Sequence, residues 1–196
     1  MRLRRYAEAI EAHEQALRLD PQDSTAWHNK AIALAELERY AEALEAYEQA
    51  LQLDPQNSAT WQAKGSTLTK LGCNLEALEA YERALQLNPQ NIAAWANKGV
   101  ALAELGRHVE ALEAHERALQ LNPQNSMSWH NKGLALVELG RDVEALEAYE
   151  RALQLNPEEP ESWHSKGLAL ARLGRYAEAR EAYERAFQLD PEHFAN

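Results

Sequence analysis

Residues 76–89 read EALEAYERALQLNP, residues 144–157 repeat the same letters, and residues 110–123 differ from them only at His115. Apolar residues recur in this stretch every three or four positions, which is the pattern of an amphipathic helix. The final proline disfavours helical backbone in the residue before it, so we expect the helix to end there. Three nearly identical copies indicate that this helix belongs to a repeated unit.

The period of that unit is 34 residues. It is kept by five tryptophans and six prolines, namely Trp27, Trp61, Trp95, Trp129, Trp163, Pro21, Pro55, Pro89, Pro123, Pro157 and Pro191. Such a period is typical of a solenoid, in which one supersecondary unit stacks on copies of itself. Solenoids usually bind other molecules, and the sequence holds no nucleophile elbow, phosphate loop or paired-cysteine motif. We therefore expect no catalytic residues and a chain that is not an enzyme.

Each complete unit also contains a helical pattern around its tryptophan, running from about Thr25 to Leu37 in the first of them. This is the first helix of the unit, and the stretch quoted above is the second. Glycine follows the first helix in four units, where a left-handed cap suits it, at Gly72, Gly106, Gly140 and Gly174. Other small residues recur where the two helices must approach closely, including Gly65, Gly99, Gly133 and Gly167. No strand-like alternation interrupts the pattern, so we predict an all-α fold.

The pattern of Trp, Gly, Ala, aromatic, Ala and Pro resembles the tetratricopeptide repeat family. It is carried by Trp95, Gly99, Ala111, His115, Ala118 and Pro123. The resemblance implies an α-α superhelix of antiparallel helix pairs. Departures from the family pattern are Ala31 for glycine, His13 and His115 for the aromatic residue, and Lys30, Lys64, Lys98, Lys132 and Lys166 at a usually apolar place.

The repeats predict a single solenoid domain with definite boundaries. It is composed of a half repeat at 1–23, complete repeats at 24–57, 58–91, 92–125, 126–159 and 160–193, and a tail at 194–196. No polar capping helix is visible, although solenoid ends normally need one for solubility. We therefore expect a fragment of a larger protein, a self-sufficient monomer, or self-association through the ends. The residues expected in the last case are Leu3, Tyr6, Ile10, Leu17, Tyr183 and Phe187.

The formal net charge of −11 disfavours nucleic acids and anionic membranes as partners. No apolar run approaches the length that spans a membrane, so we expect a cytoplasmic protein. The seven histidines do not predict a metal site, because those at equivalent places in neighbouring repeats would lie about 10 Å apart. The single cysteine, Cys73, cannot form an internal disulfide. We expect no metal and no cofactor.

The resemblance also implies where a partner would bind, because the first helices line the concave surface in this family. The side chains expected there are His28, Asn29, Ile32, Gln62, Ser66, Lys70, Asn97, Val100, Glu104, His130, Asn131, Leu134, Glu138, His164, Leu168 and Arg172. The basic clamp that some relatives use for acidic chaperone tails is absent. An asparagine ladder, which other relatives use to hold peptide backbone, is matched by Asn29, Asn97 and Asn131 and interrupted at Ala63 and Ser165.

These observations predict a protein-interaction scaffold that binds an extended peptide or a helix of a partner in the concave groove. Two alternatives stay open: a self-assembly unit that associates through its ends, and the non-catalytic regulatory array of a larger protein. The repeated lysines have two interpretations as well. They could pack their stems and reach nearby glutamates, or form a basic line for an anionic ligand.

Overall fold

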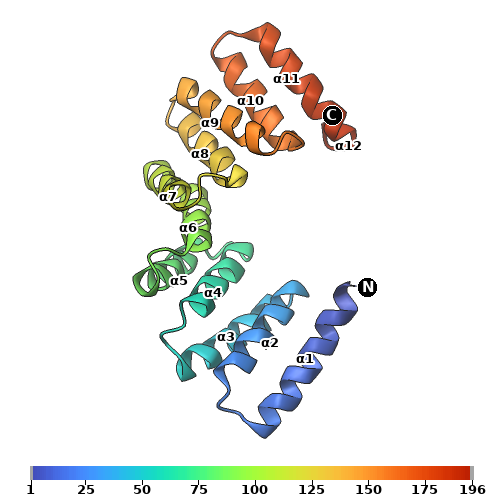
Figure 1. The fold of residues 1–196 in the computed structure, drawn as a ribbon, viewed down its shortest axis with the longest axis vertical. Coiled ribbons are helices and arrows are strands. Elements are labelled where there is room, and N and C mark those ends of the chain that lie inside the picture. Colours follow the sequence, from blue (N-terminus) through green and yellow to red (C-terminus); the bar gives the residue numbers. More distant parts are fainter. Residues whose placement is uncertain (1, 195–196) are drawn as a thin grey trace. The chain divides into compact units, whose positions relative to one another are not determined.

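The computed structural model describes residues 2–194, with side chains for residues 4–193. Within this part the chain forms helices and no strand (Figure 1). The helices are α1 (Arg2–Leu19), α2 (Ser24–Glu36), α3 (Tyr40–Leu53), α4 (Ser58–Lys70), α5 (Asn74–Leu87), α6 (Ile92–Glu104), α7 (His108–Leu121), α8 (Ser126–Glu138), α9 (Asp142–Leu155), α10 (Pro160–Arg172), α11 (Tyr176–Leu189) and α12 (Pro191–Phe194).

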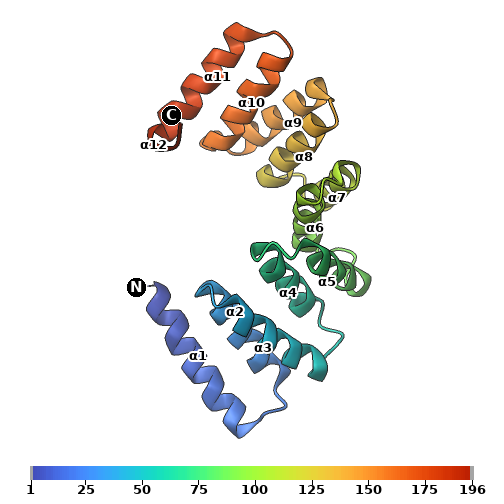
Figure 2. The same cartoon turned by 180° about the vertical axis from the view of Figure 1, so that it is seen from behind.

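Two compact units make up the chain, Met1–Ala101 and Leu102–Asn196, and their boundary falls inside α6. In the first unit α2 packs on α3 and α4 packs on α5, while α1 packs on α2 and α3 on α4. In the second unit α8 packs on α9 and α10 on α11, and α9 joins the two pairs through its contact with α10 (Figure 2). The first helices α2, α4, α8 and α10 therefore each pack on the second helices before and after them. The predicted all-α arrangement of antiparallel helix pairs is confirmed, and the single domain stays a prediction.

Four first helices begin with the same side-chain cap. The residue before each helix accepts a hydrogen bond from the backbone N–H three residues later, at 2.9–3.0 Å, in the pairs Asp23 with Ala26, Asn57 with Thr60, Asn91 with Ala94 and Asn125 with Ser128. This bond satisfies one of the amide donors that a helix leaves unpaired at its start. α10 begins after Glu159 without a side-chain cap.

Substitution of Glu159 by asparagine should therefore raise the free energy of unfolding by about 1 kcal/mol. The new side chain would cap the amide of Ser162, and it would also remove a carboxyl whose pKa is raised by its hydrogen bond with Glu161. Urea unfolding followed by circular dichroism measures the change. The reverse substitution, Asn125→Glu, is the matched control and should cost a similar amount. Equal stability of Glu159→Asn and the parent would show that the cap adds nothing here.

The first helices end as the sequence predicts where glycine is present. Gly72, Gly106, Gly140 and Gly174 have φ values between 71° and 75°, which is left-handed backbone. Glu38 occupies the same place in the first complete repeat and adopts φ 59°. A side chain is strained in this conformation, because its Cβ approaches the following carbonyl oxygen.

The recurring tryptophans and prolines are directly connected. In all five complete repeats the indole Nε1–H donates to the carbonyl oxygen of the proline six residues earlier, at 2.9–3.1 Å. The bond ties the start of each first helix to the turn that precedes it. The shared period of the two residue types therefore has a structural cause.

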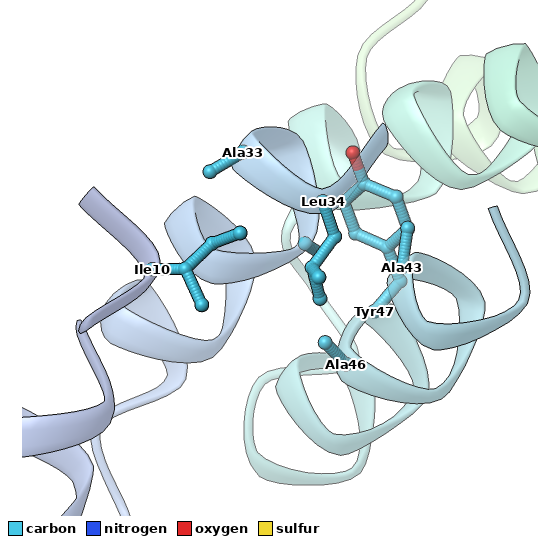
Figure 3. Close-up of a cluster of buried hydrophobic side chains, with 7 residues drawn as sticks. Ile10, Ala33, Leu34, Ala43, Ala46 and Tyr47 are labelled. Carbon is cyan, nitrogen blue, oxygen red and sulfur yellow. The ribbon is translucent and has the colours of Figure 1, made fainter. Parts of the chain in front are cut away.

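In four of the five complete repeats the small residues of the core face a tyrosine, and in the third His115 takes its place. In the first repeat Leu34 of α2 lies between Ile10 of α1 and Tyr47 of α3 (Figure 3). Glycine replaces alanine in later repeats, and a Cβ added to Gly65 or Gly133 would lie 2.5–2.6 Å from a ring carbon of Tyr81 or Tyr149. The aromatic ring therefore occupies the space of the missing side chain.

Candidate functional site

The predicted binding residues lie on the first helices, and the structure brings them together in two places. In the first unit α2 contacts α4, and in the second α8 contacts α10. We call these the α2–α4 face, with His28, Asn29, Ile32, Gln62, Ser66 and Lys70, and the α8–α10 face, with His130, Asn131, Leu134, Glu138, His164, Leu168 and Arg172. The remaining three, Asn97, Val100 and Glu104, lie on α6. A continuous groove over all five repeats stays a prediction.

Two of the histidines connect neighbouring first helices. His28 Nδ1 lies 2.9 Å from Thr60 Oγ1, and His130 Nδ1 lies 2.9 Å from Ser162 Oγ. Their rings pack on Tyr47 and Tyr149, with centroids 6.0 Å and 5.6 Å apart. Burial lowers the pKa of both histidines below the ordinary value of 6.5, because a charged imidazole loses hydration there. Both histidines are therefore neutral at pH 7. Their hydrogen bonds to Thr60 and Ser162 connect each first helix to the next one.

His164 lies at the same place in α10 and is more open. Its ring packs on Tyr183 with a centroid separation of 5.4 Å. The side chain is half-buried, whereas His130 is only 9% exposed. A ligand on the α8–α10 face would therefore meet His164 more than His130.

The carboxamides of the predicted ladder are half-buried at Asn29, Asn97 and Asn131. Burial raises the pKa of Tyr81 and Tyr149, and the nearby side chains of Asn97 and Ser165 act in the opposite direction. An amide group has both a donor and an acceptor, so a carboxamide at this place can bond to a ligand.

Aliphatic side chains are exposed beside these polar groups. Ile32, Leu134 and Leu168 are 37%, 43% and 47% exposed, and Val100 is half-buried. Met127, which was not among the predicted binding residues, is 53% exposed. Its place seven residues before Leu134 puts both on one face of α8. That spacing is visible in the sequence and could have identified it.

Some predicted residues at the ends of the first helices are already bound to the preceding repeat. Lys70 Nζ lies 5.9 Å from the centroid of the Tyr40 ring, and Arg172 Nε lies 3.0 Å from Asp142 Oδ1. Both partners begin the second helix of the preceding repeat. These two cations therefore join neighbouring repeats and are not free charges. Glu104 and Glu138 are exposed at the corresponding places.

The five repeated lysines pair with glutamates of the second helix before them. The Nζ to Oε1 distances are 2.8–3.1 Å in the pairs Lys30 with Glu14, Lys64 with Glu48, Lys98 with Glu82, Lys132 with Glu116 and Lys166 with Glu150. Each ammonium also lies 5.5–5.9 Å from the ring centroid of the tryptophan three residues earlier. Of the two interpretations of these lysines, the structure therefore favours packed stems and paired ammonium groups over a free basic line.

Shallow grooves open between the helices of two pairs. One of about 390 Å³ lies between α2 and α3, and one of about 310 Å³ lies between α10 and α11. They share the repeat's tryptophan, lysine and leucine, which are Trp27, Lys30 and Leu34 in the first groove. None of the predicted binding residues lines them, so they are separate from the two faces.

The residues expected at a self-association surface divide into two groups. Ile10 and Leu17 are 6% and 8% exposed, because the packing of α1 on α2 covers them. These two side chains therefore offer little exposed surface in this structure, and their part in self-association stays a prediction. Tyr6 and Tyr183 are half-buried, and Phe187 is 47% exposed. The side chain of Leu3 lies outside the described residues, and self-association itself stays a prediction.

No group of three or more metal-binding side chains occurs among the described residues. In the same part of the chain, no helix combines the length and apolar character needed to cross a membrane. Cys73 is a half-buried free thiol just before α5.

Stacked helix pairs whose first helices present exposed side chains define a helical-repeat protein. A family model described as tetratricopeptide repeat matches residues 1–58, 63–126 and 130–193, and a second model of the same description matches residues 46–79. The chain therefore belongs to the tetratricopeptide repeat family.

Solved structures show the same fold. MamA is 24% identical with a TM-score of 0.77, and the match covers 85% of this chain and 97% of that one. A form of MamA from Desulfovibrio magneticus RS-1 is 21% identical with a TM-score of 0.80, covering 86% and 95%. YrrB, described as a TPR protein with an unusual peptide-binding site, is 24% identical with a TM-score of 0.77, covering 94% and 95%. No significant match was found among curated protein sequences.

Proposed function

We propose that the chain is a protein-interaction scaffold that binds an extended peptide or a helix of a partner on its first-helix faces. The observation that carries this function is the exposure of Ile32, Leu134 and Leu168 at one equivalent place in three repeats. A single exposed aliphatic side chain is normal on a protein surface, but its recurrence at one place of the repeat, on the helices that are expected to bind, suits contact with a partner. Membership of a family of helical scaffolds supports the proposal.

The neighbouring carboxamides supply the polar part of such a site. Asn29 and Asn131 lie three residues before Ile32 and Leu134, so each amide is next to an exposed aliphatic group on the same helix. The amide can donate to a peptide carbonyl and accept from a peptide N–H, while the aliphatic group contacts the partner's side chain. This combination suits a segment whose backbone is accessible.

Replacement of both Asn29 and Asn131 by alanine should weaken binding of a selected peptide about thirtyfold, because two amides lose hydrogen bonds of roughly 1 kcal/mol each. Peptides are first selected from a random displayed library against the full chain, and their affinities are measured by fluorescence anisotropy. Gln52→Ala, which removes an exposed carboxamide from the second helix α3, is the control and should leave the affinity unchanged. Binding on the first helices would be contradicted if the Asn29 and Asn131 double variant and Gln52→Ala lost the same affinity, or if neither lost any.

A further inference from the structure

The two first-helix faces differ in chemistry. On α8, Met127 and Leu134 are exposed on one side of the helix, and Leu168 is exposed at the place on α10 that corresponds to Leu134. We call these three residues the α8–α10 apolar patch. On the α2–α4 face the corresponding places hold Thr25 and Ile32 on α2, and Ala59 and Ser66 on α4. Only one of those four is a large aliphatic residue.

The size of the patch suits several anchoring side chains. Met127 and Leu134 lie seven residues apart, which is about 10 Å along a helix. Neighbouring helices that contact each other have axes about 8–10 Å apart, and His130 on α8 is bonded to Ser162 on α10. The three side chains therefore form a triangle with two sides of about 10 Å and a third of about 14 Å, which is wide enough for two or more apolar groups of a partner.

The charge around the patch is negative. Glu138 lies one turn beyond Leu134 on α8, Glu161 lies two turns before Leu168 on α10, and both are exposed. The nearest arginine, Arg172, is held by Asp142 at 3.0 Å. The lysines of these helices, Lys132 and Lys166, are paired with glutamates of the preceding second helices.

We propose that the α8–α10 apolar patch is the anchoring site for a protein segment that carries aliphatic or aromatic side chains flanked by lysine or arginine. The carboxylates of Glu138 and Glu161 complement the basic flanks, and the net charge of −11 attracts such a segment over longer range. Acidic segments are repelled by the same groups. This inference rests on the proposed function and assigns its partner's chemistry.

The experiment pans a random peptide library on the full chain and compares the selected peptides on variants. We expect the selected peptides to hold two or more large apolar residues and an excess of Lys and Arg. The pair Leu134→Ser and Leu168→Ser should weaken their binding about tenfold or more, as loss of apolar anchors does at other interfaces. The matched control is Val143→Ser on the second helix α9, where the valine is 60% exposed. This control should not change the affinity more than about twofold.

A second pair of variants tests the charges without touching the apolar side chains. Glu138→Lys and Glu161→Lys change exposed residues, so the fold should persist, and binding of the basic peptides should fall and lose its dependence on salt. Selected peptides that are acidic, or that bind the leucine variants as tightly as the parent, would overturn the anchoring site while leaving a peptide-binding scaffold. Failure to select any peptide would remove both proposals.

Discussion

Replacement of Gly133 by valine should lower the free energy of unfolding by about 3 kcal/mol. A Cβ at this position would lie 2.5 Å from Tyr149 Cε1 and 2.8 Å from two further ring carbons. Tyr149 is 1% exposed and cannot swing into solvent without leaving the core. The branched side chain therefore forces α8 and α9 apart, and the gain in helix propensity over glycine, below about 1 kcal/mol, does not offset this cost.

Urea unfolding followed by circular dichroism measures the effect of this change. Tyr149→Leu replaces the ring with a smaller aliphatic side chain, so the double variant should be more stable than the sum of the single costs predicts. Leu134→Val, at the adjacent exposed position of α8, is the control and should change stability by less than about 0.5 kcal/mol. Additive effects of Gly133→Val and Tyr149→Leu would show that the two positions do not share the space.

This close contact was predictable from the sequence because small residues and tyrosine keep the same period. Glycine at Gly133 and alanine at Ala145 mark the places where two helices approach, and both are buried in the structure. The alanine at Ala31, in place of the glycine, is equally buried beside the ring of Tyr47. A tyrosine can therefore be accommodated against a Cβ when the rest of the repeat is adapted to it.

Other parts of the structure could not be predicted from periodicity. Glu38 adopts the left-handed backbone that glycine has in the other repeats, because the turn needs that conformation whatever residue is present. The sequence pattern also did not predict that Ile10 and Leu17 are buried. An amphipathic helix shows which residues are apolar, but not which of two possible neighbours covers them.

Within the candidate site, exposure was easier to predict than pairing. Their positions in the repeat predicted that Leu134 and Leu168 lie on the open side of the first helices, and both side chains are exposed in the structure. The repeat pattern gave no sign that His130 bonds to Ser162, because the two residues are 32 positions apart and the bond depends on how two repeats stack. The attachment of Arg172 to Asp142 depends on stacking in the same way.

Acidification from pH 6.5 to about 4 should remove about 3 kcal/mol of stability through His115 alone. The side chain is 1% exposed, and its Nδ1 atom has no hydrogen-bond partner among the described residues. Burial lowers the pKa of His115 from 6.5 to about 4, because the charged imidazole would lose its hydration. The contribution of His115 to stability is therefore fully present above pH 6.5. Below that pH the unfolded chain binds the proton first, and the loss is complete only below about pH 4.

The contributions of other titrating groups to the pH dependence differ in the pH interval over which they are lost. His28 and His130 also have lowered pKa values and add to the loss in the same direction. Glutamates paired with basic groups, such as Glu14, have pKa values lowered below 4.5, so their contribution is lost only at more acid pH. The interval from pH 6.5 to 4.5 therefore reports mainly on buried histidines.

His115→Tyr isolates the contribution of one histidine within that interval. Tyrosine occupies the corresponding place in α3, α5 and α9, at Tyr47, Tyr81 and Tyr149, so the larger ring suits this position of the repeat. Urea unfolding at a series of pH values should show a flatter pH dependence for this variant than for the parent. Tyr149→His is the matched control and should make the dependence steeper, since it places a second imidazole in a buried site. A pH dependence that His115→Tyr leaves unchanged would mean that protonation at this position is not what destabilises the fold, whatever the burial of the ring.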